Sequence, residues 1–100
     1  MDKKIKNVLI ELGITPNLKG FNCIVEAVIY IMENNDAKTT DVYEHVANAL
    51  GYKAANVERT IRHCVLNADK NSESWRRYIG IKIANNSTFL FVLAMRLEED

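Results

Sequence analysis

Proline and glycine are scarce, with one proline and four glycines in 100 residues. This scarcity favours helices joined by brief turns. The chain has no run of about 18 apolar residues, which excludes a membrane-spanning helix. The N-terminus lacks a signal-type apolar segment with a cleavage site, so we expect a cytoplasmic protein. Apolar residues make up 48% of the chain, which predicts one compact domain over residues 1–100 with a modest core.

Cysteine and histidine are also scarce, with two of each. Cys23 and Cys64 both fall on apolar helical stripes, which is most simply explained by reduced core residues. A disulfide or a metal site is the less simple alternative, because His45 and His63 lie on different predicted helices and no ligand spacing results. There is no glycine-rich phosphate loop, no paired carboxylates and no nucleophile with a base. We therefore predict no metal, no cofactor and no enzymatic activity.

Hydrophobic periodicity predicts an all-α fold with about six helices. The first helix is expected over residues 2–12, with Gly13 as its stop. The second is expected from Gly20 to Glu33, and its lack of polar surface predicts that it is the most buried helix. A short helix should follow a Ser72 cap and end before Gly80, with a core side made of Trp75, Tyr78 and Ile79.

The stretch from Thr39 to Ala68 is predicted to form two short helices joined by a tight turn at Gly51. The first of them should begin at Thr40 or Asp41. Its N-cap is expected among Thr39, Thr40 and Asp41, with Glu44 completing a capping box. Its apolar face should comprise Val42, Val46, Ala49 and Leu50.

The second helix of this pair should start at Lys53, Ala54 or Ala55, without a strong cap. At 3.6 residues per turn, the residues of this helix divide into a core side and a polar side. The core side comprises Val57, Ile61, Cys64 and Ala68, with Val65 at its edge, and the polar side comprises Ala55, Glu58, Arg59, Arg62 and His63. This is the layout of a helix-turn-helix, in which the second helix enters the DNA major groove. An arginine side chain can donate hydrogen bonds to O6 and N7 of guanine together, and a carboxylate can accept a hydrogen bond from N4 of cytosine. The alternative is an ordinary solvated helix face.

The net charge of zero argues against a nucleic-acid-binding protein, but the charges are unevenly distributed. From Lys53 to Lys82 there are seven basic and three acidic residues, a net charge of +4, while the remainder carries −4. A basic face on an otherwise acidic domain is enough for local attraction to phosphates.

The run AANVERTIRHCV resembles the recognition helix of the C-terminal effector domain of the sporulation initiation transcription factor of endospore-forming bacteria. That family carries V-E-R-x-I-R-H at this place. The resemblance extends from about Val8 to Glu98. It includes Leu12-Gly13-Ile14 with Pro16, Lys19-Gly20-Phe21, Glu26-Ala27, and Asn86-Ser87 followed by Phe89.

The resemblance implies a six-helix all-α fold, promoter binding through the helix-turn-helix, tandem dimers on DNA and contact with RNA polymerase. Double-stranded DNA is thus the expected partner. By position Glu58 and Arg59 would read bases, and Arg62 and His63 would share that interface. The full set of candidate DNA-binding residues is Lys53, Ala55, Asn56, Glu58, Arg59, Arg62, His63, Arg76 and Arg77.

The chain departs from the family pattern in two ways. The N-terminal phosphoacceptor receiver domain of full-length members has no counterpart in these residues. Lys53-Ala54-Ala55-Asn56 replaces a helix start that contains threonine and serine, so the phosphate contacts and the target site are expected to differ.

The last segment allows two interpretations. Ile81-Lys82-Ile83 alternates like a strand and, with Phe89-Leu90-Phe91-Val92, would form the wing of a winged helix. We favour a final helix from Ser87 to Glu98, capped by Asn86 or Ser87, because the resemblance implies it.

The seven consecutive apolar residues from Phe89 to Met95 wrap more than one helix face, which predicts a weak homodimer or a dimer formed on DNA. The candidate contact residues are Phe89, Leu90 and Leu93, with Leu90 and Leu93 on the outer side. Burial of the whole run inside the monomer is the rival interpretation.

A second hypothesis is a protein-interaction module that keeps the fold without promoter binding, such as an inhibitor, adaptor or antirepressor. The zero net charge and the apolar final helix suit this role.

Overall fold

The computed structural model describes residues 2–81 and 85–99, and within these residues all regular structure is α-helical. The helices are α1 (Asp2–Glu11), α2 (Phe21–Glu33), α3 (Thr39–Leu50), α4 (Ala54–Asn67), α5 (Glu73–Tyr78) and α6 (Asn86–Glu99). The predicted all-α fold is therefore confirmed. The predicted strand falls largely on residues 82–84, which lie outside the described part, whereas Phe89–Val92 belongs to α6. None of the six helices combines the length and apolar character that crossing a membrane requires.

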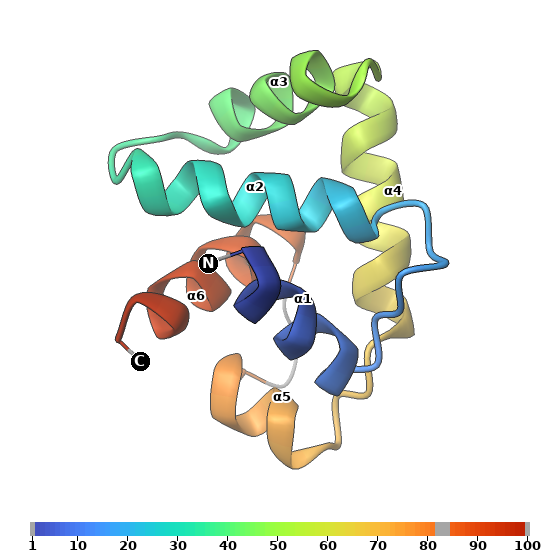
Figure 1. The fold of residues 1–100 in the computed structure, drawn as a ribbon, viewed down its shortest axis with the longest axis vertical. Coiled ribbons are helices and arrows are strands. Elements are labelled where there is room, and N and C mark those ends of the chain that lie inside the picture. The colour runs from blue at the N-terminus through green and yellow to red at the C-terminus, as the bar shows by residue number, and fades with distance from the viewer. Residues whose placement is uncertain (1, 82–84, 100) are drawn as a thin grey trace.

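Helix α2 lies at the centre of the fold and packs against α1, α3, α4 and α6 (Figure 1). Seven of its 13 residues are buried, which confirms the prediction from its nearly unbroken apolar sequence. Helix α3 lies along one side of α2, and α1 and α6 lie along the other. Helix α4 runs across the end of α2, so the α3–α4 pair rests directly on this central helix.

The helix ends predicted at glycine and at Ser72 are confirmed. Gly13 after α1 and Gly80 after α5 lie in the left-handed region, at φ 89° and 75°. Gly51 follows α3 in the left-handed region at φ 76°, where a side chain would be strained. At the start of α5, the Ser72 hydroxyl accepts a hydrogen bond from the Trp75 amide at 3.0 Å. Trp75, Tyr78 and Ile79 are all buried, and the Trp75 ring lies 5.8 Å from that of Phe89 in α6.

The N-caps predicted for α3 and α6 are wrong. Helix α3 begins one residue earlier than expected, at Thr39, with Lys38 as its N-cap residue. The backbone N–H of Lys38 donates to the Asp41 carboxylate at 3.1 Å, which leaves Glu44 no part in the cap. Asn85 caps α6 by accepting from the Thr88 amide at 2.8 Å, so neither Asn86 nor Ser87 is the cap.

The apolar run of α6 is mostly directed into the core. Phe89, Leu90 and Leu93 are at most 1% exposed. The prediction that Leu90 and Leu93 lie on the outer side is therefore wrong, because both are needed to fill the space between α6 and the rest of the core. Met95 is 49% exposed, and Phe91 is half-buried.

The core stripe of α4 is confirmed, since Val57, Ile61, Cys64, Val65 and Ala68 are all buried. The stripe predicted for α3 contains one error. Val42 and Val46 are buried, but Ala47 rather than Ala49 completes the buried face.

Candidate nucleic-acid interface

Helices α3 and α4 are joined by the three residues Gly51, Tyr52 and Lys53. The left-handed backbone at Gly51 lets the Tyr52 amide return to the Ala47 carbonyl at 2.9 Å, which closes the end of α3. Helix α4 starts at Ala54, as predicted, and the Lys53 side chain does not cap it. The Asn56 and Val57 amides already donate to the Lys53 carbonyl at 3.0 Å. The amides of Ala54 and Ala55 therefore remain available to an anion, at an end that carries positive helix-dipole charge.

The inner face of α4 is held very close to the segment that precedes α2. A Cβ atom placed on Gly20 would lie 2.6 Å from the Thr60 carbonyl oxygen and 2.7 Å from the Cys64 sulfur. The backbone of Gly20 is in the ordinary right-handed region, at φ −81°. Glycine is therefore required here for space rather than for its conformational freedom, and it sets how closely α4 approaches the core.

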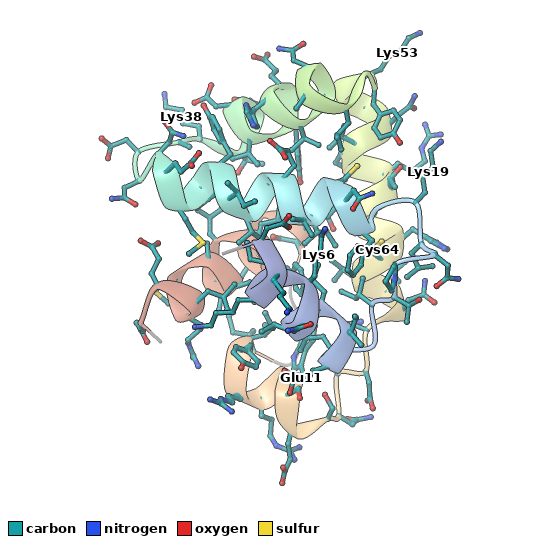
Figure 2. All side chains as sticks on the ribbon, viewed as in Figure 1. Lys6, Glu11, Lys19, Lys38, Lys53 and Cys64 are labelled. Atoms are coloured by element: carbon teal, nitrogen blue, oxygen red, sulfur yellow. The ribbon has the colours of Figure 1, made fainter. Side chains whose placement is uncertain are left out.

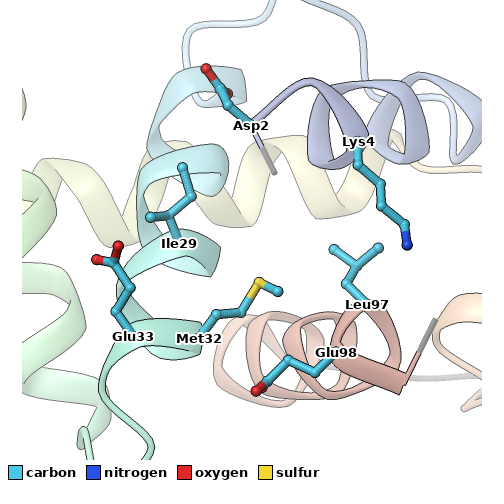
Figure 3. Close-up of a pocket in the computed structure, with 7 residues that line it drawn as sticks. All are labelled: Asp2, Lys4, Ile29, Met32, Glu33, Leu97 and Glu98. Atoms are coloured by element: carbon cyan, nitrogen blue, oxygen red, sulfur yellow. The ribbon is translucent and has the colours of Figure 1, made fainter.

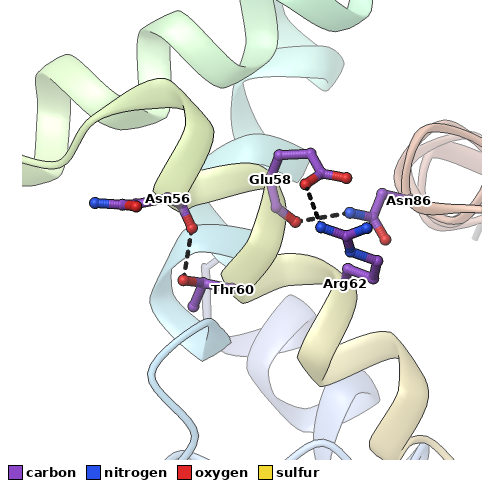
Figure 4. Close-up of polar contacts among 5 residues, drawn as sticks. All are labelled: Asn56, Glu58, Thr60, Arg62 and Asn86. Atoms are coloured by element: carbon purple, nitrogen blue, oxygen red, sulfur yellow. Dashed lines mark hydrogen bonds and ion pairs between the residues drawn. The ribbon is translucent and has the colours of Figure 1, made fainter.

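Helix α6 provides a second point of attachment for α4. The Asn86 side-chain amide donates to the Glu58 carbonyl oxygen at 2.8 Å (Figure 4). Its neighbour Ser87 shares a 2.7 Å hydrogen bond with the Thr39 hydroxyl at the start of α3. The beginning of α6 thus contacts both helices of the α3–α4 pair.

The outer face of α4 brings together most of the residues predicted to bind DNA. Lys53, Ala55, Asn56, Arg59, Arg62 and His63 are all exposed, on this one helix and the residue before it. Glu58 is half-buried beside them. The outer face is small at Ala54 and Ala55 and becomes larger and basic one turn later, at Arg59.

Two of the charged side chains on this face bind each other. Arg62 Nη2 donates to Glu58 Oε2 at 2.9 Å, and their side chains are 56% and 38% exposed (Figure 4). Such a pair at positions i and i+4 contributes only about 0.3–0.5 kcal/mol to stability. It does, however, fix the direction of the Arg62 guanidinium. Arg59 makes no hydrogen bond or ion pair with the described residues and is free to extend outward.

A half-buried tyrosine of α3 lies next to this pair. Burial raises the pKa of the Tyr43 hydroxyl, and the Asn86 amide opposes this by stabilising the phenolate. The charges of Glu58 and Arg62 are close enough to act on the same hydroxyl. The junction of α3, α4 and α6 is therefore a small polar cluster at the edge of the apolar core.

Arg76 and Arg77 do not join the face formed by α4. They belong to α5, which lies at the opposite end of the molecule from the α3–α4 turn (Figure 1). Arg76 Nη1 donates to the Asn71 carbonyl at 3.2 Å, and the Arg77 guanidinium lies 5.2 Å from the centre of the Tyr78 ring. Both residues are exposed, so any contact with DNA would be separate from that of α4.

One further basic residue, Lys19, lies beside the turn. Lys19 Nζ lies 5.5 Å from the centre of the Tyr52 ring, and Figure 2 shows Lys19 and Lys53 on the same side of the molecule. Only the packing of the loop before α2 against α4 brings Lys19 here. Its position on a different predicted loop offered no sequence signal for this proximity.

The two cysteines lie in the hydrophobic core. Cys23 and Cys64 are both free thiols with no exposed surface. Burial raises the pKa of Cys23 to about 11 and also raises that of Cys64, so both are neutral at physiological pH. In the part of the chain that the structure describes, no group of three or more histidine, cysteine or acidic side chains is placed to hold a metal ion.

Comparison with known protein families gives a match that covers nearly the whole fold. Residues 5–97 match the family model described as sporulation initiation factor Spo0A C terminal. The matched region runs from within α1 to near the end of α6 and includes the complete α3–α4 pair.

Proposed function

The chain belongs to the family of sporulation initiation factor Spo0A C-terminal domains, whose general role is DNA binding in transcription regulation, and on this premise we propose that it recognises a specific DNA sequence through a helix-turn-helix. In this proposal α3 is the bracing helix and α4 enters the major groove. The observation that carries it is the outer face of α4, where Arg59 projects without a partner among the described residues, beside the small residues Ala54 and Ala55.

The small side chains at the start of α4 support this assignment. The major groove of B-DNA is about 12 Å wide and admits one α-helix. Small side chains at the start of α4 allow close approach of its backbone to the groove, where N-terminal residues of a recognition helix contact base edges. Arg59 lies within the first two turns of α4 and is in reach of those edges. Arg62 lies beside Arg59, and its ion pair with Glu58 gives its guanidinium a defined direction.

The charges around the start of α4 support a division between base and phosphate contacts. We assign base reading to Arg59, with Glu58 and Arg62 acting as a linked pair. Lys53, Lys19 and the amides of Ala54 and Ala55 would contact phosphate groups. Asn56 and His63 flank the face, and Arg76 and Arg77 would meet the backbone elsewhere on the duplex.

The direct test is selection of bound sequences from a random pool of double-stranded DNA, near physiological salt. We expect enrichment of one short sequence and a steep fall in affinity with salt, as phosphate contacts require. Failure to enrich any sequence with folded protein would contradict the proposal. It would favour the alternative in which the domain keeps the family fold as a protein-interaction module.

Replacing Arg59 with alanine should weaken binding to the selected site by about 1–3 kcal/mol and relax the preference at one base pair. The reason is that a guanidinium bound to a base edge carries sequence information, unlike one bound to phosphate. The measurement is a titration of the selected site and of its single-base variants by fluorescence anisotropy.

Two matched variants control for loss of a positive charge. Arg76→Ala should weaken binding to all sequences alike, and Lys3→Ala, at an exposed position of α1, should change little. An Arg59→Ala protein that is folded by circular dichroism and discriminates among sequences as the unmodified protein does would remove Arg59 from the base-reading role.

We also propose that two copies associate when they occupy neighbouring sites on DNA. The buried residues Phe89, Leu90 and Leu93 are excluded as the contact surface. The outer side of α6 offers Met95, at 49% exposure, one turn from the half-buried Phe91 and Val92. This small surface is consistent with a weak dimer.

Sedimentation at increasing protein concentration, with and without DNA carrying two sites, measures the association. We expect a monomer at low concentration and cooperative occupation of paired sites, reduced in a Met95→Glu variant. Independent occupation of the two sites would contradict the dimer.

Contact with RNA polymerase rests on family membership alone and is measurable by transcription from a template that carries the selected site.

A further inference from the structure

A cavity of about 700 Å³ lies where the start of α1, the end of α2 and the end of α6 meet. Its apolar floor consists of Ile29, Met32 and Leu97, and four charged residues surround the opening, namely Asp2, Lys4, Glu33 and Glu98 (Figure 3). Binding pockets typically measure about 300–1,000 Å³ and combine an apolar lining with a few polar groups. The cavity has this composition, and the DNA-binding proposal does not use it.

The opening of the cavity is acidic. Three carboxylates and one ammonium group surround it. Asp2 is partly neutralised by Lys6, whose Nζ lies 3.5 Å from its carboxylate. Glu33 and Glu98 are exposed and make no hydrogen bond or ion pair with the described residues.

Helix dipoles add to this negative potential. Glu33 is the last residue of α2, and Glu98 lies in the last turn of α6, so two helix C-termini border the cavity. The C-terminal end of a helix carries partial negative charge and favours a nearby cation. The last turn of α2 contains no basic residue. The last turn of α6 contains Arg96, whose guanidinium donates to the Arg77 carbonyl at 2.7 Å. The N-terminus of α1, which carries partial positive charge, also borders the cavity, and the first residue of this helix is the acidic Asp2.

The cavity lies on the side of the molecule away from α4. Figure 1 shows the end of α2 and the C-terminus on one side and α4 on the other. The cavity therefore stays accessible when α4 lies in a DNA groove. Its carboxylates would repel phosphate groups, which excludes nucleic acid as an occupant.

We propose that this cavity binds a segment of a partner protein in which a bulky apolar side chain is flanked by lysine or arginine. The apolar side chain would contact Ile29 and Met32, both half-buried and thus still reachable, and the flexible Met32 side chain can adapt to its shape. The carboxylates of Glu33 and Glu98 come from different helices on different parts of the rim (Figure 3). A peptide segment with several spaced cations offers each of these carboxylates a partner of its own.

The test uses two synthetic peptides with blocked ends, Lys-Lys-Leu-Phe-Lys-Lys and Glu-Glu-Leu-Phe-Glu-Glu. Each is titrated into the isotopically labelled full chain while backbone amide resonances are followed by NMR. We expect saturable shifts in residues 29–33 and 97–98 with the basic peptide and none with the acidic one. No saturable shift there with the basic peptide, or an equal response to both, would overturn the proposal. No DNA is present, so the result is independent of the proposed function.

Charge reversal provides the matched comparison. The double variant Glu33→Lys/Glu98→Lys should weaken binding of the basic peptide by about tenfold, through loss of attraction at two rim positions. The double variant Glu11→Lys/Glu44→Lys makes the same change in net charge at exposed positions outside the cavity. It should bind as the unmodified chain does. Equal weakening in both variants would show a general charge effect and contradict binding at the cavity, and circular dichroism verifies that both are folded.

Discussion

Replacement of Ile61 by alanine is expected to lower the free energy of unfolding by about 2–5 kcal/mol, the range for truncation of a buried isoleucine. Ile61 has no exposed surface and lies at the centre of the buried stripe of α4. Its removal leaves a cavity between α4 and the helices beneath it. Because small domains have only about 5–15 kcal/mol of stability in total, chemical denaturation followed by circular dichroism should show a large shift in midpoint.

Leu66 offers a control on the same helix. Its side chain is 70% exposed, so Leu66→Ala should change stability by less than about 0.5 kcal/mol. Both variants remove a large aliphatic side chain from α4, and they differ mainly in burial. Equal shifts in the two denaturation midpoints would mean that the burial assigned to the two faces of α4 is wrong.

The second large effect is expected at Gly20. Alanine at this position should destabilise the fold by about 3 kcal/mol, near the upper end of the usual range for overpacking. The added methyl group would lie 2.6 Å from the Thr60 carbonyl oxygen, an atom of the α4 backbone. Relief requires α4 to move away from α2, since no side-chain rotation clears a backbone atom. Denaturant unfolding measures the loss, and titration of the selected DNA site should show weaker binding by the displaced helix.

Gly51 separates this steric effect from the conformational one. Its φ of 76° disfavours any side chain, but a Cβ atom placed on Gly51 would have no neighbouring atom within 4 Å. Gly51→Ala should therefore cost only the left-handed backbone strain, about 1–2 kcal/mol. If Gly20→Ala proved no more destabilising than a surface substitution, the close approach of α4 to this segment would be contradicted.

Periodicity along the chain predicted the parts of the fold that depend on local sequence. The helices around Val57 and Ile61 and around Trp75 and Tyr78 follow from apolar spacing at 3.6 residues per turn. The ends at Gly51 and Ser72 follow from local backbone chemistry. The polar residues of α4 were predicted to share one face for the same reason.

The wrong N-cap predictions for α3 and α6 concern choices among neighbouring residues. Thr39, Thr40 and Asp41 are all suitable caps, and the hydrogen bond from Lys38 to Asp41 is decided by the path of the preceding loop. Asn85 and Asn86 present the same ambiguity. Asn86 is buried and committed to the Glu58 carbonyl, 28 residues earlier in the chain, which leaves Asn85 to cap α6.

Contacts between distant segments could not be predicted from spacing. Seven apolar residues in a row do not show which side of α6 faces the core, and for this reason the prediction for Leu90 and Leu93 is wrong. The proximity of Lys19 to Tyr52 and the cavity bordered by three helix ends likewise depend on tertiary packing. Gly20 resembles an ordinary turn glycine in the sequence, and its steric role is defined only by the approach of α4.

Helices α3 and α4 pack on the central helix α2. This packing has a consequence for moving the α3–α4 pair into another protein. A peptide covering Thr39–Asn67 would carry every residue of the α4 face, yet its buried stripes would lose the α2 surface that they cover. Isolated helices of this length are marginal in water. Grafting the sequence of α4 into an unrelated scaffold should therefore fail unless the host also provides a glycine opposite Thr60 and Cys64 and an amide donor for the Glu58 carbonyl. If α4 reads DNA as proposed, its sequence preference would transfer to another protein only together with the surface on which α4 packs.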